Sequence, residues 1–311
     1  MSTRHLSLLI LLAAFWGASF LFIRVGVADF GVAPLMVLRV GFGALFLLVL
    51  ALARNGAAGL ARTLRRHAWP LLVCGLLNSA APFCLFAFAE LTLQAGITSV
   101  INATAPLWAA VVAYLWLGER LSMPRVFGLV LGFAGVLLLV GNQVLAPEGS
   151  TGGASAGATA LAAAAALGAT LLYGIAANYT KRKLSGVDPL INATGTMTGA
   201  TLLLLPFALA TWPAAPASAQ AWGAVIALGI LCTGVAYLIF FYLIAHVGPS
   251  RTITVTFVIP IFGILWGALF LGETVAPIML VGCAVVLLGT ALATGAIRRI
   301  PGFGSARDTA A

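Results

Sequence analysis

The sequence predicts an all-α integral membrane protein with ten transmembrane helices, arranged as two inverted five-helix repeats with both termini in the cytoplasm. Three observations predict this fold class: an apolar composition, ten apolar runs of spanning length, and a repeat relating the two halves of the chain. Hydrophobic residues make up 62% of the 311 residues and charged residues only 7%. An average soluble domain has about 25% charged residues. The composition therefore excludes a water-soluble globule, and its many aliphatic residues exclude a disordered chain.

The apolar runs have the length that a lipid bilayer requires. A helix crosses a hydrocarbon core of about 30 Å with roughly 20 apolar residues, because lipid offers unpaired backbone amides no partner. Ten such runs lie near residues 6–26, 34–54, 69–88, 95–116, 124–142, 156–178, 189–210, 221–244, 252–271 and 276–296. We expect a first repeat over residues 1–142, a linker over 143–157, a second repeat over 158–298 and a cytoplasmic tail over 299–311.

The positions of the basic residues predict the orientation of the spans. Lys and Arg near span ends accumulate on the cytoplasmic side of a membrane. When loops are assigned to alternate sides, only Arg24 and Arg39 of the 16 basic residues fall on one side. A misplaced span would mix the two sets. The net charge of +9 therefore reflects orientation, and nucleic acid is not an expected partner. As an alternative, Arg4 and the apolar run that follows it resemble a cleavable signal peptide, whose loss would leave nine spans.

An internal repeat relates the two halves of the chain. At an offset of 154 residues Pro106 meets Pro260, and Leu117-Gly118-Glu119 meets Leu271-Gly272-Glu273. Near the start of each half the offset is 157, which pairs Trp16-Gly17 with Tyr173-Gly174. Because each half holds an odd number of spans, the second copy enters the membrane from the opposite side. Inverted repeats of this kind are common in carriers, where they give two states that open to opposite faces.

These residues resemble those of the EamA family of the drug/metabolite transporter superfamily. The resemblance rests on the five-span duplication, Trp16-Gly17, Leu38-Arg39, the two mid-span prolines and the two Leu-Gly-Glu turns. It implies an inner-membrane carrier that exports small metabolites. Among family members the chain most resembles the YddG-type exporters of aromatic amino acids.

Polar and aromatic residues near the middle of the spans are the candidate substrate-binding residues, because an inverted-repeat carrier binds its substrate where the halves meet. Interhelical hydrogen bonding is the alternative role for the two asparagines, and packing is the alternative for the rings. Without a charge at the midplane, such a site suits neutral or zwitterionic amphiphiles such as aromatic amino acids. The candidates are Trp16, Asn78, Ser79, Phe83, Asn102, Trp108, Tyr173, Tyr237 and Thr256.

Two prolines are the candidate gating residues. Pro106 and Pro260 occupy matching positions in spans four and nine, where each removes one backbone hydrogen bond and frees a carbonyl. We interpret them as flexing points that open the two faces. The alternative is a fixed kink.

Charged residues predict how transport is driven. Glu119 and Glu273 each follow a glycine at a span end, so we interpret them as turn or capping residues. The midplanes hold no Asp, Glu or His, so we expect no buried carboxylate for proton coupling and favour an uncoupled facilitator, with a proton-coupled exporter as the alternative. Arg39 lies about five residues inside its span, from which its head group can reach water. Attraction of a substrate carboxylate is its alternative role.

An enzyme is a distant alternative, for example one that modifies lipid. No nucleophile with a base, paired carboxylates or metal-ligand cluster is evident, so no catalytic residue, metal or cofactor is expected. The four cysteines lie in apolar runs as small buried hydrophobes. A passive channel could share the inverted duplication. The expected partners are a small-molecule substrate and the bilayer, and the oligomeric state stays open, with a monomer sufficient to form the site.

Overall fold

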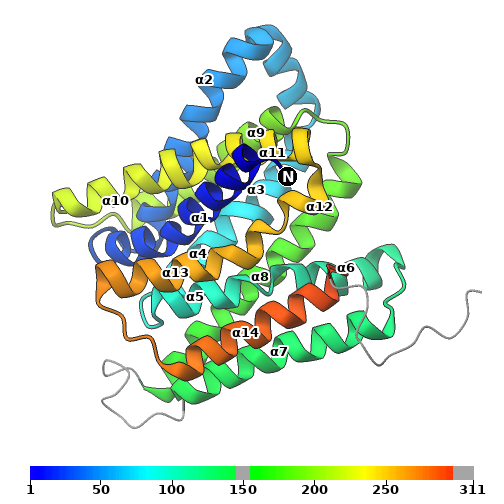
Figure 1. The fold of residues 1–311 in the computed structure, drawn as a ribbon. Helices are drawn as coiled ribbons and strands as arrows, with labels where there is room; N and C mark the ends of the chain where they lie inside the picture. The colour runs from blue at the N-terminus through cyan, green and yellow to red at the C-terminus, as the bar shows by residue number, and fades with distance from the viewer. Residues whose placement is uncertain (145–154, 297–311) are drawn as a thin grey trace, which may run out of the picture.

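The computed structural model describes residues 1–144 and 155–296, which contain all ten predicted spans (Figure 1). Within these residues every regular element is a helix. Eight helical segments are long and apolar enough to cross a membrane, and two shorter apolar helices, Val255–Leu271 and Pro277–Ala293, complete the ten. Most of the predicted linker and the predicted tail over 299–311 lie outside the described residues.

The first half of the chain supplies five spans. The second span continues past the predicted loop at Arg54-Asn55-Gly56, because the chain kinks at Gly56 (φ 68°) and remains helical to Arg66. The third and fourth spans are each built from more than one segment. The elements are α1 (Thr3–Phe30), α2 (Val32–Arg66), α3 (Ala68–Gly75), η1 (Leu76–Ala80), α4 (Ala81–Ala89), α5 (Ala95–Asn102), α6 (Ala105–Leu117) and α7 (Met123–Val144).

The second half repeats this order. Its third span is again interrupted by a π-helical segment, and its fourth begins with a single short turn of helix. The elements are α8 (Ala156–Lys183), α9 (Pro189–Ala210), α10 (Ala219–Gly229), η2 (Ile230–Val235), α11 (Ala236–Val247), α12 (Pro249–Thr252), α13 (Val255–Leu271) and α14 (Pro277–Ala293).

The two π-helical segments were not predicted from the sequence, and they obey the repeat. The offset of 154 places Leu76, the first residue of η1, on Ile230, the first residue of η2. In η2 the Thr233 hydroxyl donates to the Leu228 carbonyl at 2.9 Å, five residues back along the chain, so a carbonyl released by the wider turn keeps a partner. Such segments occur frequently at functional sites.

The predicted mid-helix prolines occupy different local positions. Pro106 lies in the first turn of α6, just after a break at Ala103 and Thr104. A proline costs little there, because the first helical N–H groups have no intrahelical partner. Pro260 lies inside α13, and the break in that span comes earlier, at Ile253. The two spans are therefore interrupted at unequal distances from their prolines, and the gating role stays a prediction.

Contacts at one end of the bundle join loops that the charge pattern places on the cytoplasmic side. Lys181 Nζ lies 2.8 Å from Glu119 Oε1, and Arg54 Nη2 lies 3.8 Å from Asp188 Oδ2. We call this end, which carries the Leu117–Glu119 turn, the basic end.

Contacts at the other end join loops of the opposite predicted side. Asp29 accepts a hydrogen bond from the Ser218 amide at 2.8 Å, and Glu273 accepts one from the Ala95 amide at 2.7 Å. We call it the Glu273 end. Figure 1 shows the turn after α6 at the right of the bundle and the turn after α13 at the left. The two Leu-Gly-Glu turns therefore lie at opposite ends, as an inverted repeat requires.

The buried side chains form two large clusters that hold the cavity between them. One joins α1, α5, α8 and α13 through residues such as Leu12, Ile97 and Ile259. The other joins α1, α2, α9 and α10 through residues such as Leu35 and Met197. Helices from both halves contribute to each cluster, so the two repeats share their hydrophobic core.

Candidate functional site: a cavity between the two repeats

A cavity of about 580 Å³ lies between the repeats. Its walls come from α1, α2, α4 and α6 of the first half and from α8, η2, α11 and α13 of the second. Its volume falls within the range of small-molecule sites, which are typically ~300–1,000 Å³. The cavity therefore matches the position that the inverted repeat predicts for a substrate.

Most of the residues predicted from the sequence line this cavity. Ser79, Trp108 and Pro260 do not. The Ser79 hydroxyl and the Trp108 indole nitrogen are buried without a hydrogen-bond partner, and the Trp108 ring packs against Phe133 at 4.8 Å. The predicted residues that line the cavity are Trp16, Asn78, Phe83, Asn102, Pro106, Tyr173, Tyr237 and Thr256.

Further aromatic rings complete the walls. The ring of Phe240 lies 5.3 Å from that of Trp16, and the ring of Phe86 lies 5.9 Å from that of Tyr173. Neither Phe86 nor Phe240 is among the residues predicted from the sequence, although the offset of 154 pairs them with each other. That pairing is the sequence signal that could have identified them.

Arg39 is buried and lines the cavity, so the interpretation that its head group reaches the membrane surface is wrong. Its side chain is only 7% exposed. Its guanidinium carbon lies 3.6 Å from the centre of the Phe83 ring, and its Nε donates to the Thr233 hydroxyl at 3.4 Å. Because α2 begins at Val32, Arg39 lies deeper in its helix than the predicted span suggests.

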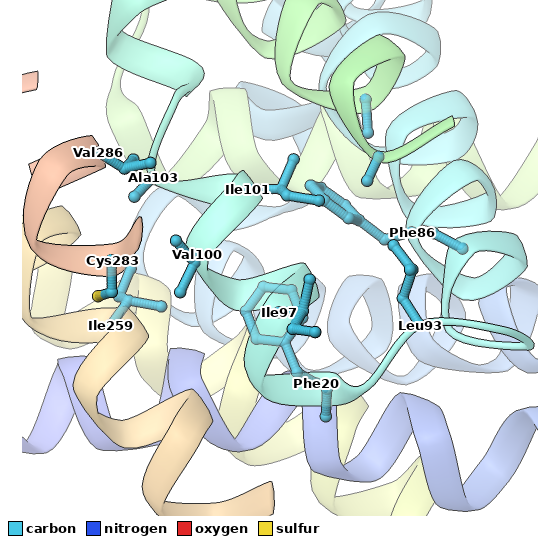
Figure 2. Packing of buried hydrophobic residues seen from close by; sticks show 14 of the residues in the cluster. Phe20, Phe86, Leu93, Ile97, Val100, Ile101, Ala103, Ile259, Cys283 and Val286 are labelled. Carbon is cyan, nitrogen blue, oxygen red and sulfur yellow. The ribbon is translucent and has the colours of Figure 1, made fainter. Parts of the chain in front are cut away.

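Apolar side chains close the cavity at the Glu273 end. Figure 2 shows Phe20, Phe86, Leu93, Ile97 and Ile101 packed beside one another around α5. The rings of Phe20 and Phe86 meet edge to face with their centres 5.9 Å apart. Each of these five residues is at most 5% exposed. This apolar layer separates the cavity from the Glu273 turn.

The cavity opens at the basic end. There its lining includes Glu119, Arg125 and Ile253, and the Ile253 side chain is 48% exposed. A solute can therefore enter from the basic end in this conformation, which we call the basic-end-open state.

Glu90 is a buried carboxyl group, so the expectation that the chain has none is wrong. It is the first residue after α4, it is fully buried, and both carboxyl oxygens are without a hydrogen-bond partner. Burial, with a smaller contribution from the nearby Glu273 carboxylate, raises the pKa of Glu90 well above its ordinary value. Arg24 donates a hydrogen bond to the main-chain carbonyl of Glu90 rather than to its carboxyl group. From the sequence Glu90 is simply a span-end residue, and only tertiary packing buries it.

Glu273 is a capping residue, as predicted, but it caps a helix of the other repeat. Its Oε1 accepts from the Ala95 amide at 2.7 Å and its Oε2 from the Gly96 amide at 3.0 Å, at the start of α5. Glu119 instead pairs with Lys181. Within residues 1–144 and 155–296 no three His, Cys, Asp or Glu side chains lie close enough to hold a metal ion.

Comparisons with known proteins agree with this architecture. The chain is 27% identical over 293 residues to the uncharacterized transporter YvbV of Bacillus subtilis, covering 93% of this chain and 91% of that one. It is 26% identical over 287 residues to a probable terminal-alkyne amino-acid exporter of Streptantibioticus cattleyicolor, covering 91% of each. A solved crystal structure superposes with a TM-score of 0.67 at 19% identity, covering 96% of this chain and all of the other, which supports the fold.

The same comparisons recover the duplication. The sequence profile of the EamA-like transporter family matches residues 4–141 and, a second time, residues 160–295. These two matches correspond to the two five-helix repeats whose shared cavity is described above. The chain is a multi-pass membrane protein that belongs to the EamA-like transporter family.

Proposed function

We propose that this protein exports amino acids, aromatic ones preferentially, across the bacterial inner membrane by alternating access. The observation that carries the proposal is the cavity, which both repeats line and which opens at the basic end only. If the basic end faces the cytoplasm, as the charge pattern predicts, this state loads substrate from the cytoplasm.

The cavity walls support an amphiphilic substrate. Aromatic rings from Trp16, Phe86 and Phe240 offer an apolar surface, and the amides of Asn78 and Asn102 offer hydrogen bonds. The relative from Streptantibioticus cattleyicolor, which bears the name of an amino-acid exporter, supports the same substrate class. A phosphorylated sugar would need several buried cations, whereas Arg39 and Arg125 are the basic residues of the lining.

We further propose that transport runs down the substrate gradient without proton coupling. Glu90, the buried carboxyl group of the described chain, does not line the cavity and lies on the far side of the apolar layer around Phe20 and Phe86. A proton on Glu90 therefore has no route to the basic end in this state.

Flux measurements with purified protein in liposomes test the proposal. We expect the protein to accelerate uptake of labelled Phe, Trp and Tyr, and not of a phosphorylated sugar, without a pH gradient. Unlabelled substrate on the far side should accelerate exchange, which a passive channel does not produce. Failure of all three aromatic amino acids to move would refute the substrate assignment.

A proton-coupled exporter is the second candidate, and Glu90 is the observation that favours it. In that case a pH gradient alone would drive uphill flux, and Glu90→Gln would abolish the gradient dependence. Under the uncoupled mechanism the pH gradient leaves the final distribution of substrate unchanged, in both wild type and Glu90→Gln.

A further inference from the structure

Arg39 brings a positive charge into the protein interior that no described acidic residue pairs with. The described residues hold two ion pairs within 4.0 Å, Arg54 with Asp188 and Lys181 with Glu119, and both involve partly exposed side chains. An arginine stays protonated in proteins. Burying an unpaired ion costs several kcal/mol, so the site around Arg39 favours the arrival of an anion.

The guanidinium is held in one orientation. Its plane is anchored on the Phe83 ring at 3.6 Å, and its Nε is bonded to Thr233 in η2 at 3.4 Å. Its two terminal nitrogens donate to no described residue, yet they are not among the atoms sealed away from solvent, so they border the cavity. Two adjacent N–H groups of a fixed guanidinium fit the two oxygens of a carboxylate.

The surroundings of Arg39 determine which carboxylate fits. Tyr237 and Asn78 also line the cavity on the helices that contact α2, and each can donate a further hydrogen bond to a carboxylate. The rings of Trp16 and Phe240, 5.3 Å apart, offer the cavity an apolar wall for the rest of the molecule. The surroundings therefore suit one carboxylate attached to an apolar or aromatic group.

We propose that Arg39 binds the carboxylate of the transported molecule, with Phe83 and Thr233 as the positioning residues that hold its guanidinium toward the cavity. The proposal deepens the proposed export of amino acids and rests on it for the assumption that the cavity is the transport site. It adds the molecular end that enters first: the carboxylate reaches deepest, and the side chain packs on the aromatic walls.

Binding of three related probes to the purified full-length protein tests this. Phenylalanine carries a carboxylate and an ammonium group, 3-phenylpropionate carries only the carboxylate, and phenylalaninamide carries only the ammonium group. For wild type we expect phenylalaninamide to bind at least about tenfold more weakly than phenylalanine, because a charge-assisted hydrogen-bond pair is lost. Isothermal titration calorimetry in detergent gives the three dissociation constants.

Variants then assign the effect to Arg39. In Arg39→Gln we expect phenylalanine and 3-phenylpropionate to weaken by roughly 10- to 100-fold while phenylalaninamide is unaffected. Arg39→Lys should lie between, because it keeps the charge and loses the planar fork. Arg54→Gln, on the same helix but outside the cavity, is the matched control and should bind all three probes as wild type does.

The outcomes separate this proposal from the proposed function. Equal weakening of all three probes in Arg39→Gln, or wild type that binds phenylalaninamide as tightly as phenylalanine, would overturn the role of Arg39. Absence of binding by both carboxylates would overturn it as well. If 3-phenylpropionate is bound and transported in an Arg39-dependent way while phenylalanine is not, amino-acid export fails and the carboxylate assignment stands.

Discussion

The Leu117–Glu119 turn and the Leu271–Glu273 turn share one sequence and one backbone conformation, but their carboxylates have different partners. Both glycines are left-handed, Gly118 at φ 68° and Gly272 at φ 65°. In both turns the glutamate amide donates to the carbonyl six residues back, Ala113 at 3.3 Å and Gly267 at 3.1 Å. At the Glu273 end the carboxylate caps α5, and at the basic end it pairs with Lys181.

A residue outside the turns explains the difference. Glu273 folds back over Gly267, and a methyl group at that position would lie 3.0 Å from the Glu273 Cδ and closer still to its Oε2. The repeat places Ala113 opposite Gly267. The methyl group of Ala113 therefore blocks the equivalent position for Glu119. The comparison teaches that the closed end of the cavity depends on a small residue that permits a carboxylate to reach across to the other repeat.

Removing the Glu273 carboxylate should have the largest effect on this comparison. Glu273→Ala leaves the Ala95 and Gly96 amides without acceptors, and loss of two charge-assisted bonds destabilises the closed end by about 3 kcal/mol. We expect a cysteine placed in the cavity at Ala110, in a variant whose four native cysteines are replaced by alanine, to react roughly 100-fold faster with an impermeant maleimide added from the Glu273 side.

The matched control for this variant is Glu119→Ala, which should leave labelling from the Glu273 side at the wild-type rate. Equal labelling rates in wild type and Glu273→Ala would show that the cap does not hold the end closed.

Gly267→Ala should act in the same direction with a smaller effect. The new methyl group displaces the carboxylate without removing its charge, so we expect labelling at Ala110→Cys from the Glu273 side to rise by roughly tenfold. The repeat offers a matched control, Ala113→Gly, which removes a methyl group at the corresponding position and should leave this rate unchanged. A larger effect from Ala113→Gly than from Gly267→Ala would contradict the explanation given for the asymmetry.

Substitution of the turn glycines should affect the two ends alike. Nothing lies within 4 Å of a methyl group placed on Gly118 or Gly272, so an alanine meets only the cost of the left-handed backbone. We expect Gly118→Ala and Gly272→Ala each to lower the free energy of unfolding by about 1 kcal/mol. Thermal unfolding in detergent measures both, and clearly unequal shifts would show that the two turns are not structurally equivalent.

The ion pair at the basic end should give the smallest effect. Its side chains are 68% and 46% exposed, and such pairs contribute little to stability. The hydrogen bond from Lys181 lowers the pKa of Glu119, so the contribution of the pair is present at neutral pH and is lost as pH falls through that lowered pKa. Lys181→Ala should therefore unfold slightly earlier than wild type at pH 7 and at the same temperature in acid or in about 1 M salt. A difference that persists in acid would indicate another role for Lys181.

The sequence by itself determined the spans, their count, the inverted repeat and most of the cavity lining. These follow from lengths, rare residues at a fixed offset, and the rule that polar side chains in a bilayer face other helices or water. Trp16, Asn78 and Tyr173, for example, were predictable as lining residues because mid-span polar and aromatic positions converge where the repeats meet.

Only the tertiary structure decided the states of the charged residues. Arg39 and Glu90 lie near predicted span ends, where a side chain usually reaches water, and packing of α2 and α4 against distant helices buries both. Likewise, two identical Leu-Gly-Glu turns acquired different partners because residues six positions earlier differ by one methyl group. Burial and partner choice depend on which surfaces meet in space, and hydropathy along the chain does not contain that information.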